Sequence, residues 1–329
     1  MEIGSFIELQ LNKGKEFYSG EFYADMQIAR LNSGRTGIYH AAACLACKTV
    51  YLPYYLCETV RLFLQKKGLS VRYYSLDESF TPLLRAEDME EDSAVILVNY
   101  YGVSSEKRMT ALAKKYRKVI IDNSQAFFAK PIKNCMNVYS ARKFIGVPDG
   151  AYVIGKNAAN YIDTYSQGYS SDTALFLLQR LEYGCEGKTY ASRIINERRI
   201  DEEDVMKMSL LTQKILDGTD YTEIVQKRKE NFEYASLLFL EANKINPLQY
   251  YAEDVVPMVY PLVIGKEGVL ERLLEHKHFQ GRWWSYVTKE TPKECFENRI
   301  SRQIIPITID QRYGKIELDY LYKIIREET

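Results

Sequence analysis

Two short stretches decide the fold: residues 119–125 read VIIDNSQ, and residues 138–150 read VYSARKFIGVPDG. Each starts as an apolar, β-branched run and ends in polar residues, which is typical of a buried strand where it leaves an α/β sheet. In the first stretch, the Asp122 carboxylate would be desolvated, so it should face a cation or a ligand, unless it only caps the next helix. In the second, the glycines and proline after Lys143 indicate a tight backbone that could hold a reactive amine, although most lysines are simply solvated.

The residues on both sides of these stretches alternate between short β-rich runs and helical runs, which is the pattern of an α/β sheet. The expected strands cover residues 49–53, 69–76, 94–100, 118–122, 136–140 and 151–154, and the expected helices cover residues 55–67 and 105–116. Residues 94–98 are apolar without a break, so both faces of the sheet should be covered and most strand pairing should be parallel.

Beyond residue 155 the pattern changes, because residues 157–239 are charged and helix-periodic with few helix breakers. The rest predicts a small α+β unit, with strands at 257–265, 284–287 and 303–307 and helices at 269–277 and 316–327. We therefore expect a large domain over residues 20–215 and a small C-terminal domain over residues 216–329, which residues 1–19 join.

The composition argues against several classes of protein. Lys and Arg number 44, as do Asp and Glu, so the net charge of zero and the lack of a long basic block argue against a nucleic-acid partner. The N-terminus lacks the features of a secretory signal, and no apolar run approaches the roughly 20 residues of a membrane helix, so we expect a cytoplasmic protein without a membrane partner. Six scattered cysteines indicate reduced thiols, and Cys44 and Cys47 are interpreted as core residues of a helix, so no metal is expected.

Two further segments could contribute to a binding site. Ser33, Gly34 and Arg35 precede an Ala-rich run, and a glycine in a turn that opens a helix leaves amides free to bind an anion. The alternative is an ordinary helix cap by Ser33. Tyr54 and Tyr55 follow a strand and could cover a flat ring, although packing in the core is the more common role of aromatic side chains.

The order and spacing of these segments resemble the DegT/DnrJ/EryC1/StrS family of aminotransferases. The matching motifs are residues 33–36, the strand and aromatic segment at Pro53, residues 99–102, Asp122-x-x-Gln125 and Ser140-x-x-Lys143, with weaker matches at 208–212, at Arg228 with Asn231, and at 305–307. The resemblance implies fold type I of the pyridoxal-phosphate-dependent transferases: a large domain with a mostly parallel seven-stranded sheet flanked by helices, and a small α+β C-terminal domain.

The same resemblance implies how pyridoxal 5′-phosphate would be bound. Lys143 would hold it as a Schiff base, and Asp122 would pair with the pyridine nitrogen. Gln125 would lie near the ring hydroxyl. Ser140 would bind the phosphate together with the turn at Ser33 and the amides of Gly34 and Arg35, and the ring-stacking position falls to Tyr55 or Tyr54. Substrate contacts are expected from Tyr54, Tyr101 and Arg312, although Arg312 is equally plausible as a surface arginine.

The activity implied by the resemblance is the transfer of an amino group from an amino acid, with glutamate as the expected donor, to a keto sugar, expected to be nucleotide-linked. The product would enter amino-sugar and polysaccharide biosynthesis. The resemblance also implies a homodimer, with residues 165–183 as a candidate for the segment that reaches the partner. Two alternatives stay open: another pyridoxal-phosphate reaction such as elimination or decarboxylation, and a non-catalytic sensor that binds a sugar nucleotide on this fold.

Overall fold

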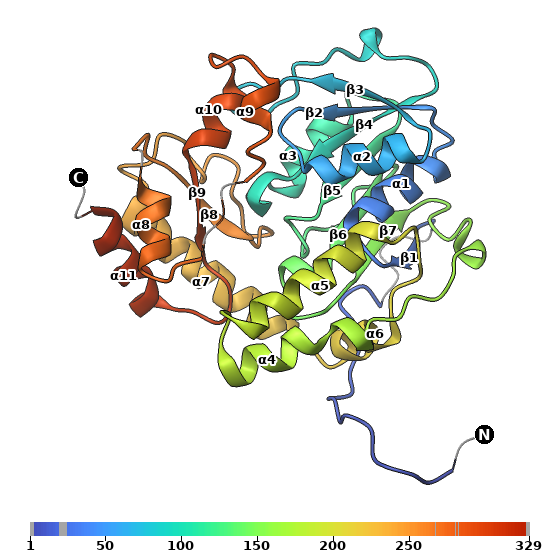
Figure 1. The fold of residues 1–329 in the computed structure, drawn as a ribbon. Coiled ribbons are helices and arrows are strands. Elements are labelled where there is room, and N and C mark those ends of the chain that lie inside the picture. The colour runs from blue at the N-terminus through green and yellow to red at the C-terminus, as the bar shows by residue number, and fades with distance from the viewer. Residues whose placement is uncertain (1–2, 20–24, 267, 280, 282, 327–329) are drawn as a thin grey trace.

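A seven-stranded sheet organises the computed structural model, which describes residues 3–19, 25–266, 268–279, 281 and 283–326 (Figure 1). The strand order is β1-β7-β6-β5-β4-β2-β3. Four neighbouring pairs are parallel, and β7 pairs antiparallel with both β6 and β1. The bounds are β1 Gln27–Leu31, β2 Thr49–Pro53, β3 Ser70–Tyr74, β4 Ser93–Val98, β5 Val119–Asn123, β6 Met136–Ser140 and β7 Ala151–Gly155. The expected sheet is confirmed, and all residues of β2, β4, β5, β6 and β7 are buried, as the continuous apolar runs predict.

Helices cover both faces of this sheet, and one of them positions the site. Helix α1 (Gly34–Cys44) packs against β5, β6 and β7. Its close approach depends on Gly37, because a Cβ there would lie 2.9 Å from Val138 Cγ1 and 3.2 Å from Val153 Cγ2. The remaining helices of this part are α2 Glu58–Lys66, α3 Glu106–Ala113, α4 Leu175–Tyr183, α5 Lys188–Glu202, α6 Leu210–Asp217 and α7 Tyr221–Phe239.

A second, two-stranded sheet lies in the C-terminal part of the chain. Strands β8 (Val259–Val263) and β9 (Ile304–Thr308) pair antiparallel, as the sequence predicts for two of its three strands there. The helices are α8 Val269–Glu275, α9 Val287–Glu290, α10 Phe296–Gln303 and α11 Lys315–Arg326, and residue 327 of the expected terminal helix lies outside the described residues.

The strand expected at 284–287 is wrong. Its aromatic and β-branched composition is typical of a strand, but Trp284 adopts a left-handed φ of 51° and packs edge-on against Tyr55 at 4.5 Å. The chain turns at this point and α9 begins at Val287.

Two hydrophobic clusters accompany the two sheets. The larger surrounds the seven-stranded sheet, and the smaller joins α7, α8 and α11 to β8 and β9. Residues 1–19 were expected in the small domain, but Tyr18 is fully buried in the larger cluster, where its ring lies 4.6 Å from that of Tyr139. Helix α7 contributes to both clusters, Ile224 to the larger and Phe232 to the smaller, so the boundary near residue 215 remains a prediction.

None of the helices in the described part of the chain combines the length and apolar composition needed to cross a bilayer. Within the same residues, no three His, Cys, Asp or Glu side chains gather in a way that could hold a metal ion.

Candidate active site

The parallel strands β4, β5 and β6 end at one edge of the sheet, where α1 begins. In the register of β5 and β6, Asp122 is the partner of Val138, so both side chains point to the same face. Val138 contacts Gly37, which identifies this face as the one that α1 covers. Ser140 lies two residues beyond Val138 and therefore shares the face. The topology thus directs Asp122 and Ser140 toward α1.

The first turn of α1 forms a cradle with two serines. A Cβ added to Gly34 would lie 3.0 Å from Ser124 Oγ and 3.8 Å from Ser140 Cβ, so both serines lie within 4 Å of one point beside the helix start. Ser33 caps the helix, accepting from the Thr36 amide at 3.4 Å, whereas the amides of Gly34 and Arg35 have no acceptor within the helix. Free amides, hydroxyls and the positive end of a helix dipole form an anion site, so the residues present fit a phosphate group.

Asp122 is a buried carboxylate with no cation beside it in the described part of the chain. Its side chain is 4% exposed, and Oδ1 accepts a hydrogen bond of 2.9 Å from the Ser124 amide. Among the described residues, no Lys, Arg or His forms an ion pair with it. An ionised carboxylate is costly to bury without a partner of opposite charge. Asp122 therefore fits a ligand that brings a cationic group, such as a protonated pyridine nitrogen, to the end of β5.

Lys143 ends a single 3-10 turn, Ala141–Lys143, which follows β6 directly. Its side chain is exposed and lines a cleft of about 960 Å³ between α4, α5 and the C-terminal part. Ser140 and Arg312 line the same cleft, so the structure brings together three residues that the sequence assigned to one site. Arg312 forms an ion pair of 2.8 Å with Asp310, which raises the pKa of its guanidinium.

The other predicted cofactor contacts have partners within the protein. The Arg35 side chain turns away toward α5, where it pairs with Asp201 at 2.6 Å, so only its amide is available at the cradle. Gln125 Oε1 accepts a hydrogen bond of 2.7 Å from the Tyr101 amide. Tyr55 is fully buried, and its hydroxyl lies 2.9 Å from that of Tyr101.

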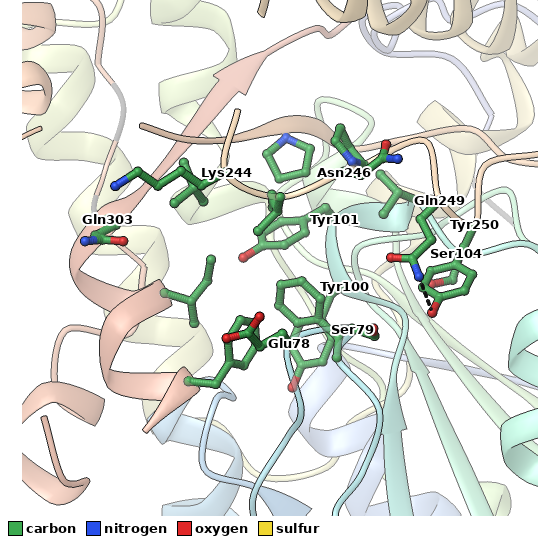
Figure 2. A pocket seen from close by; sticks show the side chains of 18 of the residues that line it. Glu78, Ser79, Tyr100, Tyr101, Ser104, Lys244, Asn246, Gln249, Tyr250 and Gln303 are labelled. Carbon is green, nitrogen blue, oxygen red and sulfur yellow. Dashed lines mark hydrogen bonds between the residues drawn. The ribbon is translucent and has the colours of Figure 1, made fainter. Parts of the chain in front are cut away.

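Tyr101 belongs to a different cleft from that of Lys143. This second cleft, of about 540 Å³, lies where the loop after β4 meets residues 244–250 and α10. Figure 2 shows Tyr100 and Tyr101 side by side along this cleft, with Lys244 and Gln303 nearby. Tyr54 lines neither cleft, because its ring stacks on Tyr73 at 4.8 Å.

Sequence reasoning missed Ser124, although it stands between Asp122 and Gln125 in a motif that the sequence analysis quotes. The signal was available: a serine two residues after a strand-end aspartate has its amide close to that carboxylate. It also missed the second carboxylate of this region, Asp149, whose buried side chain accepts hydrogen bonds from Ser209 at 3.0 Å and from Thr212.

No family model matches the sequence, and no curated protein matches it. Solved structures do share the fold. The sugar aminotransferase CalS13 from Micromonospora echinospora is 16% identical with a TM-score of 0.60, over 92% of this chain and 87% of that one. DesV from S. venezuelae, whose structure holds a ketimine intermediate, is 14% identical with a TM-score of 0.60, over 92% and 84%. ColD, a GDP-4-keto-6-deoxymannose-3-dehydratase, is 14% identical with a TM-score of 0.63, over 91% and 88%. The chain therefore has the fold of the DegT/DnrJ/EryC1/StrS-type aminotransferases, fold type I of the pyridoxal-phosphate-dependent enzymes.

Proposed function

We propose that this protein is a pyridoxal-phosphate-dependent aminotransferase that moves an amino group from an amino acid to a keto sugar. The observation that carries the proposal is the pairing of Asp122, a buried carboxylate without a cation among the described residues, with the cradle of Gly34, Ser124 and Ser140. Both lie at the sheet edge from which Lys143 emerges. This edge therefore offers a carboxylate for a pyridine nitrogen, the cradle for a phosphate, and an amine for an aldehyde.

Pyridoxal phosphate, when bound, supplies an aldehyde and a ring that withdraws electrons from the substrate Cα. The Asp122 carboxylate would keep a proton on the ring nitrogen, because a nearby negative charge favours the protonated form. The amides of Gly34 and Arg35 and the Ser140 hydroxyl would bind the phosphate. Lys143 would bind the aldehyde covalently, and its free amine would carry a proton away from the substrate Cα.

The walls of the Lys143 cleft fit anionic substrates. Arg142, Arg180, Arg193 and Arg312 line it, against Glu197 and Glu317. Arg312 is exposed and donates from Nε and Nη2 to Asp310, which leaves the edge formed by its two Nη groups for a substrate carboxylate. We propose it as the contact for the donor, with glutamate as that donor and a nucleotide-linked keto sugar as the acceptor.

The proposal includes a homodimer and a cytoplasmic location. Helices α4 and α5 expose Leu178 by 54%, Leu181 by 85%, Tyr183 by 56% and Tyr190 by 56%. Exposed apolar side chains on adjoining helices are typical of a protein interface. Leu181 also lines the Lys143 cleft, so a second copy packed here would exclude water from Lys143.

A half-reaction tests the proposed activity. Glutamate added to protein loaded with pyridoxal phosphate should give pyridoxamine phosphate and an equimolar amount of 2-oxoglutarate, and the Lys143→Ala variant should give neither. The ColD dehydratase shares the fold, so the assay must also separate transamination from elimination and decarboxylation. A cofactor that stays unchanged with a broad panel of amino acids, or release of ammonia or carbon dioxide in place of the keto acid, would contradict the proposal.

A further inference from the structure

The residue that follows Lys143, Phe144, is held by contacts from segments that are far apart in the sequence. The Phe144 ring is 3% exposed and lies 5.9 Å from Phe127 and 5.7 Å from Phe128, which follow β5. On its other side, the guanidinium of Arg228 in α7 lies 4.5 Å from the ring centroid. Main-chain contacts add to this, because the Phe144 carbonyl accepts a hydrogen bond of 2.9 Å from Gln311 Nε2. Phe144 is thus fixed at its side chain and at its backbone.

Arg228 is unusual because it is buried without a carboxylate partner among the described residues. It is 2% exposed, its Nη1 donates to the Met258 carbonyl at 3.0 Å, and its Nε has no hydrogen-bond partner in the part of the chain that the structure describes. Burial lowers the pKa of its guanidinium to about 10, with a partial offset from the charge of Asp310. A desolvated guanidinium over an aromatic face forms a stronger cation–π contact than an exposed one. The Phe144 ring is therefore a principal partner of this cation.

The same helix also fixes the loop that carries Gln311. Asn231, three residues after Arg228, donates through Nδ2 to the carbonyls of Ile309 at 3.2 Å and Tyr313 at 3.0 Å. Arg312, in this loop, lines the cleft with Lys143. Helix α7 thus reaches the lysine segment through Arg228 and the Gln311 loop through Asn231. The two sides of the cleft are tied to one rigid element.

We propose that Arg228 and Gln311 are positioning residues, which hold Phe144 and thereby fix where Lys143 enters the cleft opposite Arg312. The inference rests on the proposed function for the role of Lys143, but the mechanical connection can be measured without any cofactor. A lysine that must reach both an aldehyde and a substrate Cα depends on its placement, and a displacement of about 1 Å can lower a rate about 100-fold.

Two variants and one control test the connection. Arg228→Lys keeps the charge but loses the planar face, and Gln311→Ala removes the bond to the Phe144 carbonyl from a partly buried surface position. Arg61→Lys is the matched control, because Arg61 also lies over an aromatic ring, that of Tyr286 at 4.8 Å, but outside both clefts.

Hydrogen–deuterium exchange of the cofactor-free protein is the first readout. We expect amide exchange in residues 141–147 to rise about tenfold in Arg228→Lys and in Gln311→Ala, while exchange in β2 stays unchanged. In the Arg61→Lys control, exchange in residues 141–147 should equal that of the parent. In the loaded enzyme, kcat should fall about 10- to 100-fold while KM for the donor changes less than about threefold. If the Arg228→Lys variant does not fold, the result for Gln311→Ala alone tests the connection.

If residues 141–147 exchange in both variants at the same rate as in the parent protein, the inference is overturned. Faster exchange in a protein whose Lys143 binds no pyridoxal phosphate would support the connection and refute the proposed function instead, so the two failures can be told apart.

Discussion

Two buried aspartates stand on either side of Lys143 in the sequence, and they differ in what surrounds them. Asp149 is fully buried, accepts hydrogen bonds from Ser209 and Thr212, and lies 3.8 Å from the Arg199 guanidinium. Asp122 is nearly as buried, but its carboxylate has only the Ser124 amide as a hydrogen-bond donor among the described residues, and no cation.

We propose that this difference separates a structural carboxylate from one that binds a cofactor. Asp149 joins the turn before β7 to the N-terminus of α6, where Ser209 is the helix cap. Its charge is compensated in part inside the protein, by the hydroxyls of Ser209 and Thr212 and by the Arg199 guanidinium. The described residues supply no cation to Asp122, which is why we propose a bound cofactor as its partner. Each of the following predictions tests one side of this comparison.

The largest effect is expected for Asp122→Asn. The amide cannot keep a proton on the ring nitrogen, so kcat should fall about 10³-fold. The stability of the cofactor-free protein should stay the same or increase, because the substitution removes an uncompensated buried charge. Steady-state kinetics and urea unfolding check the two halves. A large loss of stability with normal kcat would make Asp122 a structural residue.

The opposite pattern is expected for Asp149→Ala. Removing this carboxylate deprives Ser209 and Thr212 of an acceptor and Arg199 of one of its two anionic neighbours, which should lower the free energy of unfolding by about 3 kcal/mol. Activity per folded molecule should change much less than in Asp122→Asn. Urea unfolding in the absence of cofactor gives the value, and an unchanged midpoint would show that this network contributes nothing.

A smaller effect is expected at the cradle for Gly34→Ala. The added methyl group would lie 3.0 Å from Ser124 Oγ, in the space assigned to the phosphate. We expect the Kd for pyridoxal phosphate to rise about tenfold, with little change for pyridoxal, which has no phosphate. Fluorescence titration with both compounds checks this. Equal weakening of both would indicate a general distortion of the site.

The smallest effect concerns pH. Burial raises the pKa of Asp149 above its ordinary value of 3.8, against the opposing effects of Thr212, Ser209 and Arg199. The folded state therefore binds this proton more tightly than the unfolded state, so stability falls as pH rises from the ordinary pKa through the raised one, and then levels off. The difference in unfolding free energy between the parent and Asp149→Asn, measured from pH 4 to 7, should show that slope. A difference independent of pH would contradict it.

The sequence predicted six of the seven strands of the sheet, including the edge strand β3, and missed the other edge strand, β1, for a physical reason. The runs that form β5 and β6 are apolar and end in polar residues, so their place in the sheet is visible locally. Strand β1 was missed because its sequence, QIARL, is that of a half-exposed edge strand with an arginine, Arg30, that pairs with Glu16. Helix α10 was missed because it is short and carries several charged and polar residues.

At the candidate site, backbone-dependent features were predictable and side-chain partners were not. Gly34 and Ser140 meet because helix starts and strand ends gather at one sheet edge. The engagement of Gln125 with the Tyr101 amide depends on the left-handed backbone of Tyr101, with φ 58°, for which the sequence contains no local signal. The place of Tyr101 in the second cleft was not predictable for a similar reason, because residues 244–250, distant in sequence, close that cleft around it.

The most direct measurement is borohydride reduction of the protein mixed with pyridoxal phosphate, followed by peptide mass spectrometry. We predict that Lys143 is the one modified residue and that the reduction abolishes the visible absorption of the complex. The labelling should be lost in Lys143→Ala and weakened in Gly34→Ala. A colourless mixture, or adducts spread over exposed lysines such as Lys48 at the level found on Lys143, would contradict the account.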